Sequence, residues 1–356
     1  MSDNRKEAEE KMAKAIFISG DGWLAVFDLL PPSQLGLGIA LISHRFDFYV
    51  DEHFKTRKWA LKFIQIRRKF RGNVSTNEME IFHGKPLPIP QNQLPRKVTG
   101  FERIQLFYID SNSIAFLQHF RRLFASCPIN LCFNTNSDQT FELILRNIWP
   151  MIRKNICALQ LRVGNFHRLR KYVPSCLNDC PSLRVFSFNC DGLFTEFPAD
   201  DSAMASDGQA VAKWLFTPRP DNVPKLFKCW LIDDDANLTS KIDAFKAAFA
   251  SASSPVNFIV TVFFPPDYAD SVVPFVMTNE VTREQLSLKR NDNINHNFDD
   301  SNEDFLLVRS PIARDASKWT KWEKEAIGWV IFDGQWNFLG IFDDNPAGRA
   351  FRRNSL

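Results

Sequence analysis

The chain has 356 residues, of which 45% are hydrophobic, enough for two or three domains with apolar cores of their own. Its formal net charge of +3 is too small to indicate nucleic acid or an anionic membrane as the main partner. No window approaches the run of about 20 apolar residues that spans a membrane, and the apolar run near the start is too short for a signal peptide. We therefore expect a soluble, unsecreted protein without a membrane partner.

The seven cysteines are scattered and odd in number. This pattern does not suit a disulfide framework and favours reduced thiols in the cytoplasm, the nucleus or both. The nearest approach to a metal site is the set His167, Cys176, Cys180 and Cys190. Their spacing lacks the closely paired ligands of compact zinc modules, so we expect neither a metal nor another cofactor.

Three helices are predicted near the start of the chain. Apolar residues recur at helical spacing on one face of the first helix, over residues 23–30: Trp23, Val26, Phe27 and Leu30. Asp21 is expected to cap this helix, and the pair Pro31-Pro32 must end it. A second helix is predicted from about Leu35, and residues 48–59 are predicted to form a third.

A repeating strand and helix pattern follows. Residues 61–66 alternate like a strand, and residues 67–72 and 84–95 are expected to be connectors. Four short apolar runs then predict strands whose centres lie 25, 28 and 26 residues apart: 104–109, 129–133, 156–163 and 183–188. The segments between them are predicted to be helical: 114–124, 140–154 and 166–178. This period falls within the roughly 20 to 29 residues of leucine-rich repeats and predicts a parallel-stranded solenoid.

The last part of the pattern is less regular. Two further strands are predicted over 226–232 and 256–264, after an insertion over about 190–224. Asp315 is expected to begin a helix that carries Trp319, Trp322 and Ala326 on one face. Residues 329–332 and 336–342 flank the turn signal Asp333-Gly334 and predict a hairpin. A C-terminal cap of one helix and one hairpin is therefore expected.

Polar clusters give no clear sign of chemistry. The run Asp233-Asp234-Asp235 follows a predicted strand and indicates a solvated turn more than a cation site. The basic run over 67–71 indicates a solvated connector more than a nucleic-acid contact. The chain has no Gly-rich phosphate loop, no Gly-x-Ser-x-Gly elbow and no His-Glu-x-x-His helix, which favours binding over catalysis.

Residues 18–59 resemble an F-box. The residues that carry the likeness follow the order of that motif: Asp21 for its acidic residue, Val26-Phe27 for its Ile-Phe pair, Leu30-Pro31-Pro32 for the helix end and break, Leu35 for the next leucine, and Ile42 to Phe46 for the closing motif. Ser19 stands where the family has its first proline. The other reading of this segment is an N-terminal helical cap on the solenoid, because repeat proteins need capped ends.

The rest of the chain is similar to nematode F-box-associated proteins, which join an F-box to a divergent, leucine-rich-repeat-like region. The segments that carry this likeness are 214–219 with Pro224-Lys225, 309–315 and 321–327. The resemblance covers nearly the whole chain. Its later motifs identify relatives better than they identify chemistry.

The resemblance implies a substrate-recognition adaptor of a Skp1-cullin-F-box ubiquitin ligase, with no catalytic residues of its own. It implies that five residues bind a Skp1-type adaptor and through it a cullin: Leu24, Phe27, Leu30, Pro31 and Leu35. A target protein would bind the C-terminal region, on the face lined by the strands or on the insertion over 190–224. The alternative is a leucine-rich-repeat-like interaction scaffold without a ligase role.

The expected fold is α+β, an α/β solenoid behind a helical module. Four parts are predicted: an F-box-like three-helix module over 15–60, a linker and capping region over 61–98, a leucine-rich-repeat-like region over 99–312, and a helix and hairpin cap over 313–356.

Overall fold

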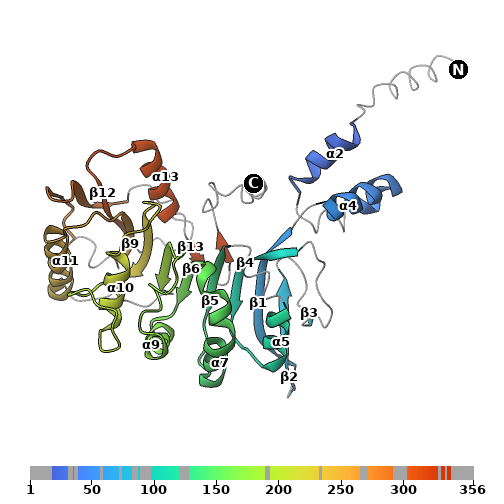
Figure 1. Ribbon diagram of the computed structural model, residues 1–356, viewed down its shortest axis with the longest axis horizontal. Helices are drawn as coiled ribbons and strands as arrows, with labels where there is room; N and C mark the ends of the chain where they lie inside the picture. The colour runs from blue at the N-terminus through green and yellow to red at the C-terminus, as the bar shows by residue number, and fades with distance from the viewer. Residues whose placement is uncertain are drawn as a thin grey trace, which may run out of the picture. The chain divides into compact units, whose positions relative to one another are not determined.

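A computed structural model describes most of the chain (Figure 1). It covers residues 18–30, 35, 39–56, 59–71, 74–81, 87–88, 98–119, 128–188, 193–231, 235–264, 272–291, 303–327, 330–332 and 335–337. The chain divides into two compact units, one of residues 1–58 with 340–356 and one of residues 59–339. The described part of the first unit is helical, and the second is built on a large β-sheet.

The helical unit contains α2 (Gly20–Phe27), the 3-10 helix η2 (Ala40–Ile42) and α4 (His44–Thr56). Ser19 begins α2, because its side-chain oxygen accepts a hydrogen bond from the Gly22 amide at 3.2 Å. The prediction that Asp21 caps this helix was therefore wrong. The predicted third helix also differs, since α4 begins at His44 and Trp59 already belongs to a strand.

An aromatic cluster holds α2 against α4. The rings of Trp23 and Phe46 meet edge to face with centroids 4.8 Å apart, and the Phe27 ring lies 5.7 Å from the His53 ring. Phe27, Val50 and His53 are all buried. The spacing of Trp23 and Phe27, one helical turn apart, turns both rings toward α4.

The second unit is mixed α/β, with one twelve-stranded sheet among the described residues. The strands are β1 (Trp59–Arg71), β2 (Val74–Ile81), β3 (Leu87–Pro88), β4 (Val98–Leu106), β5 (Ile129–Phe133), β6 (Ile156–Leu161), β7 (Val185–Phe188), β8 (Lys225–Trp230), β9 (Phe258–Phe264), β10 (Phe275–Asn279), β11 (Glu284–Arg290) and β12 (Glu303–Pro311). Their order across the sheet is β10-β11-β12-β9-β8-β7-β6-β5-β4-β1-β2-β3.

Seven neighbouring strands of this sheet are parallel: β1, β4, β5, β6, β7, β8 and β9. From β4 to β9 each strand pairs with the next one in the chain, so the sheet grows in one direction. Two neighbouring parallel strands must be joined by a connection that crosses one face of the sheet. Because such connections are right-handed, those that repeat in one direction all cross the same face.

The crossovers are helical. They contain α5 (Ser111–His119), α7 (Asp138–Leu143), the π-helix η3 (Ile144–Ile148), α8 (Trp149–Ile152), the 3-10 helix η4 (Arg153–Asn155), α9 (Val163–Tyr172), α10 (Asp207–Leu215) and α11 (Asp235–Ala250). Their apolar residues join those of the strands in one core, to which Phe141, Phe166, Trp214 and Phe245 contribute large rings. In Figure 1, α7 and α9 lie on one side of the strands and α13 (Ala316–Ile327) lies on the other.

An apolar ladder in exact pairing register runs through this core. One residue from each parallel strand faces its counterpart on the next, and all are buried: Ile64, Ile104, Leu131, Leu159, Phe186, Phe227 and Val260. The first steps along the ladder after Ile104 are 27, 28 and 27 residues. The spacing found in the sequence thus reflects one core position occupied once in each strand and crossover unit.

The predicted strands over 129–133, 156–163, 183–188, 226–232 and 256–264 are confirmed as β5 to β9, with ends within two residues of the prediction. The strand predicted over 104–109 corresponds to β4, which begins six residues earlier, at Val98, and ends at Leu106. The predicted C-terminal helix is confirmed as α13, because Asp315 Oδ1 accepts hydrogen bonds from the amides of Ser317 and Lys318. The predicted hairpin corresponds to β13 (Val330–Phe332) and β14 (Gln335–Asn337), which pair with each other. Its turn, Asp333-Gly334, lies outside the described residues.

The prediction for residues 67–72 was wrong. The basic run is part of β1, where Arg67 pairs across from Glu78 of β2. Opposite charges facing each other on neighbouring strands stabilise an antiparallel pair, so a charged run can continue a strand there. The described part of 61–98 therefore extends the sheet.

Candidate functional site

The five residues predicted to bind a Skp1-type adaptor fall into three classes. Phe27 and Leu35 are fully buried, with 1% and 0% of their surface exposed. Leu24 and Leu30 are half-buried, and Pro31 lies outside the described residues. A partner could touch Leu24 and Leu30 directly, whereas Phe27 and Leu35 act within the core of the helical unit.

Other apolar side chains of the helical unit reach solvent. Val26 and Leu29 are 37% and 38% exposed, and the amide of Leu29 donates to the carbonyl of Val26 in the turn that ends α2. Ile42 and Phe48 are exposed further along the chain. We call Val26 and Leu29 the α2 turn pair. The helical period places Val26 on the same face as Trp23 and Phe27, so no local pattern signalled the exposure of Val26.

A polar row crosses the face of the sheet opposite the apolar ladder. Successive residues of a strand point to opposite faces, so each member of this row follows directly after the ladder residue of its strand. The members are paired in register across the seven parallel strands: Gln65, Gln105, Cys132, Gln160, Ser187, Lys228 and Thr261. Gln65 Nε2 donates to Gln105 Oε1 at 2.9 Å. Six of the seven are buried and Gln65 is half-buried, so this row is not a free surface for a partner.

Helix α13 covers part of that face. The hydroxyl of Thr261 donates to the carbonyl of Ala326 at 3.2 Å. The guanidinium of Arg184 forms two hydrogen bonds, of 2.6 and 2.9 Å, to the carboxylate of Glu325. Because both side chains are mostly buried, this pair fixes α13 over β8 and β9.

Two of the segments that carry the family resemblance, 214–219 and 309–315, meet in the core of the sheet unit. The guanidinium carbon of Arg309 lies 5.3 Å from the ring of Phe216, and Arg309 Nη2 donates to Glu284 Oε2 at 2.6 Å. Both members of this ion pair are fully buried. The segments 214–219 and 309–315 are thus held together by packing, which gives them a structural role.

Lys225, which accompanies the segment 214–219 in the family resemblance, is the first residue of β8, and its side chain reaches the C-terminal end of α10. Its ammonium donates to the carbonyls of Trp214 and Thr217, the latter at 2.6 Å. Burial, together with the nearby guanidinium of Arg219, lowers the pKa of Lys225 to about 7. A cation at a helix C-terminus satisfies carbonyls that lack partners within the helix.

This lysine predicts a pH dependence of stability. Between pH 7 and 10.5 the unfolded chain binds more protons at Lys225 than the folded chain does, so this residue makes the free energy of unfolding rise with pH. Lys225→Met should reduce the rise between pH 7 and 8.5 by about 1–2 kcal/mol in urea unfolding. Unfolded cysteines begin to titrate near the top of this window and act in the opposite direction, but they are the same in both proteins and cancel in the comparison. Lys213→Met, at an exposed site on α10, is the control, and equal slopes for the two variants would contradict the prediction.

The predicted insertion contains α10 and an ordered loop before it. Ser206 and Gln209 form a capping box at the start of α10. Arg170 of α9 donates to the carbonyls of Ala205 and Ser202 and to Asp207 Oδ1, at 2.8, 3.0 and 2.9 Å. His167 Nδ1 lies 3.1 Å from Asp207 Oδ2. The contacts explain the order of this loop.

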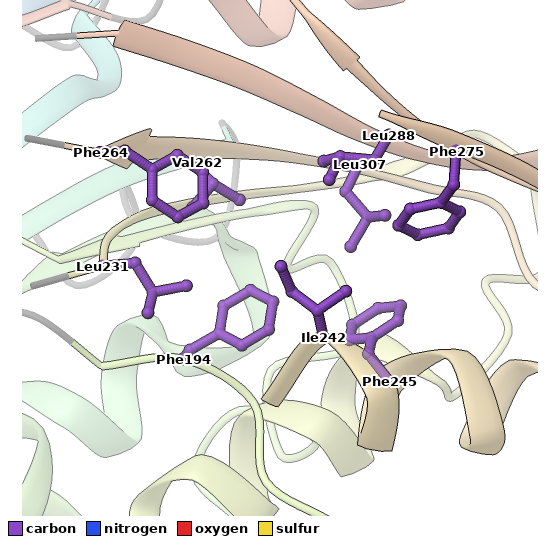
Figure 2. Close-up of a pocket in the computed structure, with 9 residues that line it drawn as sticks. All are labelled: Phe194, Leu231, Ile242, Phe245, Val262, Phe264, Phe275, Leu288 and Leu307. Carbon is purple, nitrogen blue, oxygen red and sulfur yellow. The ribbon is translucent and has the colours of Figure 1, made fainter. Parts of the chain in front are cut away.

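Two hollows lined by described residues lack the groups that catalysis needs. The first, shown in Figure 2, is about 10 Å³ and lies between α11 and the strands, with nine apolar residues around it: Phe194, Leu231, Ile242, Phe245, Val262, Phe264, Phe275, Leu288 and Leu307. It has room for about one water and offers that water no polar partner. The second, about 250 Å³, is lined by Pro218, Arg219, Asn222, Val223, Pro255, Val256, Asn257 and Pro311, without a histidine or a carboxylate.

The cysteines and the acidic run add no site. Cys176 and Cys180 are buried core residues, and burial raises the pKa of the Cys180 thiol to about 12. Cys190 and most of the predicted turn over 233–235 lie outside the described residues. Among the residues the structure describes, no three His, Cys, Asp or Glu side chains are grouped to hold a metal ion.

Comparison with known proteins identifies no relative. The chain matches no family model, no curated protein and no solved structure. Of the helices in the described ranges, none has the length and apolar character needed to cross a membrane.

Proposed function

We propose that the chain is a non-catalytic substrate-recognition adaptor of a cullin-based ubiquitin ligase. A Skp1-type adaptor would bind the helical unit, and a target would bind the sheet unit, which we propose to be an irregular leucine-rich-repeat-like solenoid. Catalysis would then be proximity, because the chain brings a target close to an enzyme held elsewhere in the complex. This role places the protein in the cytoplasm, the nucleus or both.

The observation that carries the proposal is the exposed apolar turn at the end of α2. The resemblance to an F-box predicts that the helix ending at the double proline meets the adaptor. In this unit Phe27 occupies the core, while the α2 turn pair and the half-buried Leu24 and Leu30 remain accessible. We propose that these four side chains contact the adaptor and that Phe27 and Leu35 support them from within.

The solenoid part of the proposal is supported by the chain-order pairing of β4 to β9 and by the ladder steps of 27, 28 and 27 residues. A repeat architecture stacks similar units so that each one contacts mainly its neighbours. The proposal of a binding role without chemistry is in keeping with these two hollows, whose linings contain no histidine and no carboxylate.

The test uses a Skp1-type adaptor and the full chain. Val26→Asp/Leu29→Asp should weaken adaptor binding at least about tenfold in a calorimetric titration, because charge replaces apolar anchors at the centre of the interface. Val273→Asp/Val281→Asp is the matched control, with the same change at two exposed valines of the sheet unit. Circular dichroism should be unchanged for both variants.

Unaltered binding by the folded α2 variant would place the adaptor elsewhere on the helical unit. Absence of binding by the unsubstituted chain would remove the ligase role and leave the interaction scaffold as the function.

A further inference from the structure

The two edges of the large sheet differ in how they are protected. At one edge, β3 is only two residues long and contains Pro88, which has no amide hydrogen to offer a further strand. At the other edge, β10 has five residues and, among the described residues, pairs only with β11. Natural proteins usually shield such edges with prolines, charges or very short strands. The edge at β10 has none of these within the strand.

The side chains on and around β10 suit pairing with another strand. Residues 272–279 carry no charged group. Val276 is 71% exposed and Thr278 is exposed, on the face of the sheet opposite α11, while Phe275 and Met277 are half-buried on the other face. Val273 and Val281, just outside the strand, are also exposed. The edge therefore presents open backbone groups with uncharged side chains above and below them.

The edge is held in place without a partner strand. The side-chain amide of Asn279 donates to the carbonyls of Phe249 and Ala252 at 2.8 and 2.9 Å, at the end of α11. Its oxygen accepts hydrogen bonds from the amides of Val281 and Thr282. The ammonium of Lys246 lies 4.7 Å from the centre of the Phe275 ring. A strand fixed in this way loses little conformational freedom when a partner adds to it.

We propose that β10 binds an extended segment of a partner protein, which adds to the sheet as a further strand. Backbone hydrogen bonds would supply affinity, and uncharged apolar residues at alternate positions of the segment would meet Val276 on one face and Phe275 and Met277 on the other. This binding mode deepens the proposed function, because it describes how a target would be held. It rests on the proposed function only in identifying the partner as a ligase target.

An extended segment fits this edge better than a second copy of the chain does. Two five-residue strands meeting edge to edge would bury far less than the roughly 800 Å² per partner of a stable interface. A separate segment can continue past both ends of β10 and cover Val273 and Val281 as well.

The probe is a set of ten-residue peptides selected from a random library displayed on yeast and sorted against the full chain. In hydrogen exchange, a bound peptide should slow the amides of residues 275–279. The variant Val276→Lys/Thr278→Lys, which places charges on the open edge, should weaken peptide binding about tenfold or more. Tyr172→Lys/Met204→Lys adds the same charge at two exposed sites away from β10 and should change binding less than about twofold.

Equal binding by the two variants, protection confined to other segments, or no selected peptide at all would overturn the proposal. Dimers of the unliganded chain that the β10 variant abolishes would assign the edge to a second copy and overturn it too. Binding of the Skp1-type adaptor is measured on the same variants and should be unaffected, so that failure at β10 and failure of the proposed function are distinguished.

Discussion

Glu284→Gln is expected to lower the free energy of unfolding of the sheet unit by about 3–5 kcal/mol. Arg309 Nε and Nη2 donate to Glu284 Oε2 at 3.1 and 2.6 Å, and neither side chain reaches water. Glu284 Oε1 also accepts the amide of Val256 at 2.8 Å. A neutral amide leaves the guanidinium charge buried among Phe216, Phe249 and Phe258 with no counter-charge.

Urea unfolding followed by hydrogen exchange at the amides of β11 and β12 measures this loss. Glu280→Gln provides the matched control four residues earlier, because Glu280 faces Arg283 at 3.5 Å with both side chains well exposed. Removal of this exposed pair should cost less than about 0.5 kcal/mol. Equal effects of the two substitutions would show that burial does not set the strength of the Arg309 pair.

Phe27→Ala is expected to unfold the helical unit. Truncation of a buried phenylalanine costs about 3–5 kcal/mol, and a unit of this size rarely has more than about that much stability to lose. The Phe27 ring has 1% of its surface exposed and contacts the rings of Trp23, Phe46 and His53. Amides of α2 and α4 in the full chain should then exchange nearly as fast as those of an unstructured peptide.

Val26→Ala is the comparison for this experiment, since Val26 precedes Phe27 on α2 and is 37% exposed. Its effect on exchange should correspond to less than about 0.5 kcal/mol. Slow exchange retained in Phe27→Ala would mean that the ring is dispensable for the core. The result also decides how adaptor binding is tested, because binding lost by an unfolded unit says nothing about an interface.

The sequence predicts the inner strands well because they are buried on both faces. β5 is predicted at its observed bounds, since Ile129–Phe133 is a continuous apolar run whose five residues are all buried. β1 was predicted only in part. The strand continues through Arg67 and the residues after it because they pair with β2, which comes later in the chain, and the basic run itself does not show this pairing. Helix α10 was missed although Ser206 and Gln209 carry a readable capping signal.

The candidate sites were harder to predict than the strands. A helical pattern shows that Phe27 belongs to an apolar face, yet it does not show whether that face meets another helix of the same chain or a partner. The ion pairs of Arg184 with Glu325 and of Arg309 with Glu284 join residues 141 and 25 positions apart, which no local pattern encodes. The open edge at β10 likewise follows from the order of strands in the sheet.

The position of β12 affects how the sheet is completed during folding. From β4 to β9 each new strand can attach to the one just formed, so growth follows the order of synthesis. β12 breaks this order, because it is later in the chain than β10 and β11 yet lies between β9 and β11. β9 therefore gains its second neighbour only after β12 has been made, so this end of the sheet cannot be completed in the order of synthesis and depends on a pairing between strands far apart in the chain.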